Sequence, residues 1–128
     1  MLRFREYIDA LKAQYNTQID VLVDKKTEVL QLNMRVRSDV FWLFKGGITT
    51  VLRTGAAHCR IHITYERPQL IYTLEFDTAT VDLAQLNNLR QRNELVEKLE
   101  SLQAKIDFTP HTTNAVFVLS IPVKGDGL

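Results

Sequence analysis

The chain has 128 residues, 45% of them apolar and 24% charged, which is typical of one globular domain with a sizeable core rather than of a disordered segment. Sixteen Lys and Arg against fifteen Asp and Glu leave a net charge of +1, which argues against electrostatic binding of nucleic acid or of a membrane surface. The single cysteine, Cys59, excludes an intrachain disulfide and a thiolate metal cluster.

The first third of the chain predicts a helix and then a strand. Residues 2–15 carry apolar side chains three and four residues apart, the spacing of an amphipathic helix: Phe4, Ile8, Leu11 and Tyr15. Ile19, Val21 and Val23 then alternate with their neighbours, which predicts a short strand. We expect residues 25–27 to form a polar connection, with a further short extended piece at 29–30.

The helical period returns from about Met34 to residue 54, with Asn33 or Ser38 as candidate N-caps and Gly55 as a candidate C-cap. Its apolar positions are Val36, Val40, Phe44, Ile48 and Val51. The pair Gly46-Gly47 weakens this helix by about 1 kcal/mol per glycine relative to alanine.

Alternating apolar residues over 58–77, broken at Glu66-Arg67-Pro68, predict a hairpin in which Cys59 faces inward. Residues 82–104 predict a second long helix with apolar positions at Leu86, Leu89, Val96, Leu99 and Gln103, and with Leu95 and Leu102 beside them. A last hairpin follows, with Ile106 and Phe108 on its first strand, a turn at 110–114 and a buried strand over 115–123.

This order of elements predicts an α/β (α+β) fold of one domain, residues 1–128: a two-layer sandwich of a mixed, mostly antiparallel sheet with helices on one face. No run of apolar residues approaches the roughly 20 that span a bilayer, and the first residues carry charges where an export signal needs an apolar core. We therefore expect a cytoplasmic domain without membrane contact.

The whole-chain pattern resembles the catalytic ATP-binding domain of sensor histidine kinases, the GHKL or Bergerat-type fold. The resemblance rests on the strand 18–23, the long helix from Val40 to Ala57, the hairpin 58–77, the helix Leu86-Asn-Asn-Leu-Arg-Gln-Arg and the closing strand that ends Leu119-Ser-Ile-Pro-Val. It implies a site in which a Glu and an Asn on the long helix serve water activation and Mg²⁺, an Asp after the hairpin binds adenine, and glycine turns hold phosphate.

Position by position, the resemblance places the family's Glu on Gly46 and its Asn on Thr50, and the following Lys on Arg53. The adenine-binding Asp falls on Asp77 and is retained. The family's glycines fall on Ala79 and near Leu83 and Gln85, in a stretch from 56 to 124 without any glycine. Since backbone amides form a phosphate nest most readily where glycine allows positive φ, this loss predicts weak or absent ATP binding.

The resemblance thus implies a histidine-kinase-like ATPase domain of a two-component sensor, impaired in ATP binding and acting in regulation or partner binding. We expect no catalytic residue, no metal site and no cofactor, with Asp77, Thr50 and Arg53 as a vestigial nucleotide site; Mg-ATP enters only if that site still functions. The expected partner is a protein, either a dimerising helical domain or another signalling protein, and the domain is cytoplasmic or the soluble part of a membrane-anchored sensor. Two alternatives stay open: an active kinase domain with an unusual site, and a plain α/β interaction module.

Overall fold

The structure, a computed structural model, describes residues 2–15, 17–28, 30, 32–53, 56–77, 93–111 and 113–123. Its elements follow the predicted order apart from one short helix: α1 (Leu2–Tyr15), β1 (Gln18–Val23), α2 (Lys25–Glu28), α3 (Met34–Arg53), β2 (His58–Glu66), β3 (Gln69–Asp77), α5 (Asn93–Leu102), β4 (Lys105–Pro110) and β5 (Asn114–Pro122). The predicted helix over 82–104 is described from Asn93 onward, and its earlier part, like Gly55 and Val29, lies outside the described residues.

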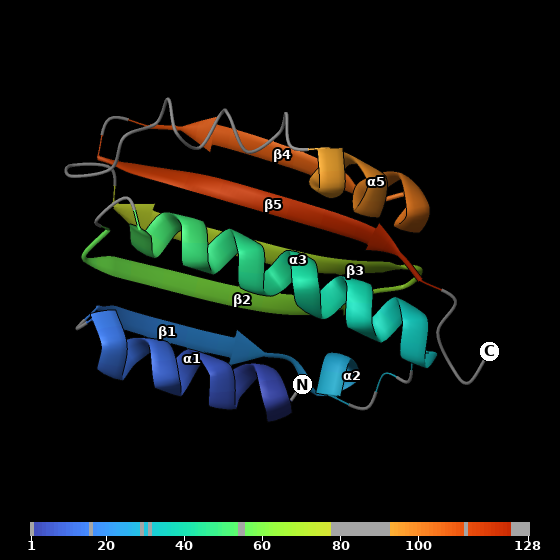
Figure 1. The fold of residues 1–128 in the computed structure, drawn as a ribbon, viewed down its shortest axis with the longest axis horizontal. Helices are drawn as coiled ribbons and strands as arrows, with labels where there is room; N and C mark the ends of the chain where they lie inside the picture. Colours follow the sequence, from blue (N-terminus) through green and yellow to red (C-terminus); the bar gives the residue numbers. More distant parts are fainter. Residues whose placement is uncertain are drawn as a thin grey trace.

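The strands form one five-stranded sheet in the order β1-β2-β3-β5-β4. β1 is parallel to β2, and the other three pairs are antiparallel. Figure 1 shows α1, α3 and α5 side by side on one face of this sheet, with α3 over the central strands. The predicted two-layer arrangement with a mixed, mostly antiparallel sheet is therefore confirmed.

The core lies between the sheet and these helices. Strands β2 and β3 turn alternate residues inward, so that Ile61, Tyr72 and Leu74 are fully buried, and Cys59 is buried as predicted. From α1, the ring of Phe4 packs edge-on against the rings of Phe41, Phe44 and Tyr72. Aromatic pairs of this kind add roughly 0.5–1.5 kcal/mol beyond their buried area.

Helix α3 is continuous through its two glycines. The side chain of Asn33 accepts a hydrogen bond from the N–H of Val36 (2.9 Å), which confirms Asn33 as the N-cap. A Cβ at Gly46 would meet nothing within 4 Å, whereas a Cβ at Gly47 would lie 3.8 Å from Cε1 of Tyr72. Gly47 therefore places bare backbone opposite the sheet, Gly46 faces open space, and the helix continues through both.

Two local predictions are wrong. Residues 25–28 form a single helical turn rather than a polar connection, because the carboxylate of Asp24 caps it by accepting the N–H of Thr27 (2.7 Å). On α5, Val96 is 37% exposed, and the residues packed against the core are Leu95, Leu99 and Leu102. Helix α5 ends at Leu102, and Gln103 adopts the left-handed φ of 55° that terminates helices.

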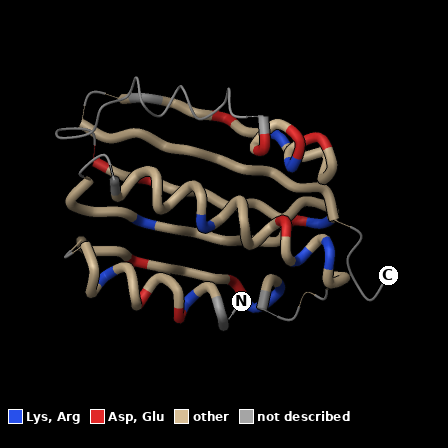
Figure 2. The backbone as a smooth tube through the Cα atoms, in the orientation of Figure 1, with Lys and Arg blue, Asp and Glu red and all other residues tan. Residues whose placement is uncertain are grey.

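Charged residues of both signs are interspersed along α1 and α5, and long stretches of β3 and β5 carry neither sign (Figure 2). Within the described part of the chain, no helix is long and apolar enough to cross a membrane.

Candidate functional site

A cavity of about 110 Å³ lies between α3, α5 and the strands β3, β4 and β5. It is therefore bounded by the long helix and the sheet, where the sequence places the vestigial site. Its lining comprises Trp42, Leu43, Gly46, Gly47, Thr50, Val51, Leu74, Phe76, Leu95, Ile106, Phe108, Phe117 and Leu119. Every side chain in this described lining is uncharged, and most are aliphatic or aromatic.

Gly46 and Thr50, the positions where the resemblance leads us to expect the family's Glu and Asn, both line the cavity. The hydroxyl of Thr50 donates a hydrogen bond to the carbonyl oxygen of Gly46 (2.8 Å), one helical turn earlier. Its hydrogen is thus directed at the backbone of its own helix rather than at the cavity. Gly46 contributes no side chain, so this part of α3 offers neither a carboxylate nor an amide.

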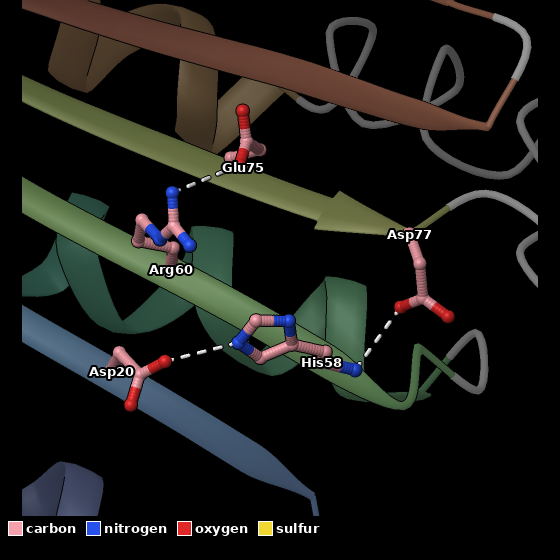
Figure 3. Close-up of polar contacts among 5 residues, drawn as sticks. All are labelled: Asp20, His58, Arg60, Glu75 and Asp77. Carbon is pink, nitrogen blue, oxygen red and sulfur yellow. Dashed lines mark hydrogen bonds and ion pairs between the residues drawn. The ribbon is translucent and has the colours of Figure 1, made fainter.

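Asp77, the last residue of β3, binds the backbone at the start of β2. Its Oδ1 accepts hydrogen bonds from the N–H groups of Ala57 (3.0 Å) and His58 (3.1 Å), and Figure 3 shows the carboxylate pointing toward His58. The burial alternation along β3 makes Phe76 the last residue of the inward-facing series. Accordingly Phe76, and not Asp77, lines the cavity.

The third residue of the predicted site, Arg53, ends α3, and its side chain lies outside the described residues. The same holds for Ala79, Leu83 and Gln85, on which the predicted loss of the phosphate turns depends. The structure thus brings Gly46 and Thr50 to one cavity and places Asp77 at the sheet end where β2 begins and β3 ends, opposite the turn that joins these two strands.

The sheet face opposite the helices carries two ion pairs, drawn in Figure 3 in front of the strands. Nε2 of His58 lies 3.0 Å from Oδ2 of Asp20, and Arg60 lies 3.7 Å from Glu75. The hydrogen bond with His58 lowers the pKa of Asp20 below its ordinary value. These side chains are all more than a third exposed, so each pair contributes little to stability. Among the described residues, no group of three or more His, Cys, Asp or Glu is placed to hold a metal ion.

The thiol of Cys59 is fully buried. Burial, with a smaller contribution from the carboxylate of Asp77, raises its pKa to about 12. Since the thiolate is the reactive form, Cys59 is a core residue and not a nucleophile.

The sequence did not predict two contacts beside the cavity, an ion pair and a cation–π contact that share Lys98. Nζ of Lys98 on α5 lies 2.8 Å from Oδ1 of Asp39 on α3, and the same ammonium sits 5.6 Å from the centre of the Trp42 ring. This contact joins the two helices that flank the cavity. No local pattern predicts it, because the two residues are 59 positions apart.

Comparison with known proteins gives similarity in structure alone. No protein-family profile and no curated protein matches the sequence. Among solved structures, a histidine kinase domain from a blue-light-activated histidine kinase of Erythrobacter litoralis superposes with a TM-score of 0.65 at 16% identity, over 90% of this chain and 57% of that one. The Acinetobacter baumannii histidine kinase AdeS gives a TM-score of 0.71 at 10% identity, over 93% of this chain and 60% of that one. The histidine kinase domain of the E. coli osmosensor EnvZ gives 0.68 at 10% identity, over 96% and 86%.

These likenesses cover nearly the whole of this chain, and they establish its fold as that of histidine kinase catalytic domains. The chain spans less than two thirds of the Erythrobacter and Acinetobacter structures. At 9–16% identity the sequence has diverged far enough that the shared fold says nothing by itself about which residues of the site still function.

Proposed function

We propose that this chain is a histidine-kinase-like ATPase domain of a two-component sensor that has lost nucleotide binding and acts through a protein partner. The observation that carries the proposal is the lining of the cavity between α3 and the sheet. Where the family pattern has a carboxylate and an amide, this cavity has Gly46 and a threonine whose hydroxyl is bonded within its own helix.

The chemistry of Mg-ATP argues for this loss. A triphosphate needs cationic side chains or clustered N–H groups, and Mg²⁺ needs oxygen ligands in near-octahedral geometry. The side chains of the described lining are uncharged and mainly apolar, so they offer charged partners neither to the triphosphate nor to Mg²⁺. Burying a charged phosphate against such a wall carries a large desolvation cost that nothing in the described lining offsets.

Asp77 supports the same proposal. One of its carboxylate oxygens already accepts two backbone N–H groups at the start of β2. A role in holding the turn between helix and strand accounts for the retention of this aspartate without a nucleotide. Regulation through a protein partner, either a dimerising helical domain or another signalling protein, then remains as the function of a preserved fold, in the cytoplasm or beneath a membrane-anchored sensor.

Isothermal titration calorimetry with Mg-ATP and Mg-ADP tests the proposal directly on the intact chain. We expect no saturable heat at millimolar nucleotide, and micromolar binding of either nucleotide would overturn the proposal.

If binding is seen, Asp77→Asn and Glu75→Gln form a matched pair, since both remove one carboxylate near the end of β3. An active domain with an unusual site predicts that Asp77→Asn abolishes the affinity while Glu75→Gln preserves it. Circular dichroism of both variants controls for the structural role of Asp77.

A further inference from the structure

The cavity between α3 and α5 has a chemistry of its own. Four aromatic side chains, Trp42, Phe76, Phe108 and Phe117, contribute to its wall, and aliphatic side chains supply most of the rest. The rings of Phe76 and Phe108 are stacked, with centroids 6.4 Å apart and planes 22° from parallel. The site therefore presents ring faces and edges to whatever enters it.

The described lining of the cavity offers few hydrogen-bonding groups. Thr50 supplies a hydroxyl to the described lining, and that hydroxyl donates to the carbonyl of Gly46. Water is retained in a cavity only where it finds two to four polar partners, and genuinely apolar cavities stay dry. An apolar molecule entering this space displaces little bound water and loses few hydrogen bonds.

The volume sets the size of the occupant. An apolar cavity of roughly 150 Å³ lined by Leu, Ile and Phe binds benzene or xenon, and pockets for drug-sized ligands run from about 300 to 1,000 Å³. The cavity here, at about 110 Å³, is in the range of a single ring.

We infer that this cavity is a binding site for a small neutral aromatic molecule of one ring, held by Trp42, Phe76, Phe108 and Phe117. The inference rests on the proposed loss of nucleotide binding, because both proposals concern the same cavity and an aromatic ligand would take the place of the nucleotide there. An aromatic ligand would gain edge-to-face or stacked ring contacts as well as the burial of its apolar surface. It would also touch both helices, because Trp42 belongs to α3 and Leu95 to α5.

The chain contains a built-in reporter for this site. Trp42 is the single tryptophan of the 128 residues, and it lines the cavity. Iodobenzene is a neutral one-ring probe whose heavy atom quenches tryptophan fluorescence on contact. We expect saturable quenching of the native chain with 1:1 stoichiometry, confirmed by calorimetry with toluene. Quenching that rises linearly without saturation, as with aqueous iodide, shows surface collision alone and overturns the inference.

Two neighbouring positions on α5 give a matched pair of variants. Leu95 lines the cavity, whereas Val96 lies outside that lining and is 37% exposed. Leu95→Phe fills the space and should weaken toluene binding at least tenfold, while Val96→Phe should leave it within twofold. Equal affinity in the two variants places the ligand elsewhere and overturns the inference.

Gly47→Ala provides a second filling variant if Leu95→Phe does not fold. Its new Cβ would make ordinary contacts with Tyr72 and Phe117 at 3.8 and 3.9 Å. We expect toluene binding several-fold weaker than in the native chain, and unchanged binding contradicts the inference.

The two proposals fail separately. Absence of both ATP and toluene binding overturns the aromatic site and leaves the loss of nucleotide binding intact. Micromolar ATP binding overturns the proposed function and removes the basis of the aromatic site.

Discussion

At the scale of single residues, Asp24 makes several local contacts at once. Oδ1 accepts hydrogen bonds from both the N–H and the hydroxyl of Thr27, and Oδ2 accepts the N–H of Tyr65 on β2 (3.3 Å). The N–H of Asp24 itself donates to the carbonyl of Ile63 (3.1 Å). One carboxylate thus caps α2 and ties it to the sheet.

Replacing Asp24 by alanine should lower the free energy of unfolding by about 1 kcal/mol, the typical loss for an N-cap. Burial tends to raise the pKa of Asp24, but the hydrogen bonds from Thr27 and Tyr65 and the charge of Lys26 outweigh it, so the pKa lies below its ordinary value of 3.8. A carboxyl with a lowered pKa in the folded state stabilises above its ordinary pKa, and the effect disappears as the pH falls through the folded value.

Urea unfolding of the native chain and of Asp24→Ala at pH 7 and near pH 3 measures this effect. The difference in the free energy of unfolding between the two proteins should be largest at pH 7 and smaller near pH 3. A difference that grows on acidification would contradict the assigned role of the carboxylate.

Among residues, the predicted sites illustrate what a sequence pattern can and cannot establish. Asn33 was predictable as a cap, because an Asn directly before an apolar-periodic stretch has a known local function. Asp24 had the same kind of local pattern, with Thr27 three residues later, but the turn it caps is too short to show periodicity. The partners of Asp77 belong to the start of another strand, and only strand pairing brings them within reach.

At the scale of elements, the contact between α3 and α5 positions one wall of the cavity. The side chains of Asp39 and Lys98 are 16% and 29% exposed, so their ion pair is shielded from solvent more than a surface pair. The ammonium also lies over the ring of Trp42. Together these contacts hold α5 against α3 beside the cavity.

A double-mutant cycle with Asp39→Asn and Lys98→Met should give a coupling energy of about 1 kcal/mol, at the upper end of the range for exposed ion pairs, because this pair is partly shielded from solvent. The exposed pair Asp9–Lys12 on α1, 3.9 Å apart, is the control. The same cycle there should give a coupling near zero, because the Asp9 side chain is 76% exposed. Equal couplings at the two sites would contradict the structural role of the Asp39–Lys98 pair.

The elements themselves follow from the sequence where periodicity is long. Helices α1 and α3 and strands β2, β3 and β5 each display their period over nine or more residues, and all lie where the pattern places them. The sequence does not select the inward face of α5, because Leu95, Val96 and Leu99 are all apolar and helical spacing allows two overlapping stripes. Packing selected Leu95 and Leu99 and left Val96 exposed.

At the scale of the whole molecule, Phe4 is one of the buried residues, with Ile8 and Leu11, that join α1 to the rest. The Phe4 side chain is 1% exposed, and its ring lies 5.5 Å from that of Phe44 on α3 and 6.2 Å from that of Tyr72 on β3. One residue near the N-terminus thus bridges two helices and the sheet. Its loss should affect the entire cooperative unit.

Phe4→Ala should lower the free energy of unfolding by roughly 3–5 kcal/mol, the typical loss when a buried aromatic side chain leaves a cavity. Leu22→Ala is the control, because Leu22 is also apolar but 61% exposed, and its effect should stay within about 0.5 kcal/mol. Urea denaturation measures both, with Phe4→Leu as a milder replacement if Phe4→Ala is unfolded. A loss at Phe4 no larger than that at Leu22 would contradict the role of Phe4 in joining α1 to the core.

The sequence by itself determined the order of the elements, the two-layer class of the fold and the stretch from 56 to 124 that has no glycine. These properties depend on local periodicity and on residue identity, both of which the chain displays directly. The tertiary structure decided the parallel pairing of β1 with β2, the placement of β5 between β3 and β4, and the apolar cavity under α3. It also gave Asp77 its backbone partners and Lys98 its carboxylate. Such features arise between residues far apart in the chain, where packing and desolvation of the assembled layers, rather than any local pattern, select the contact.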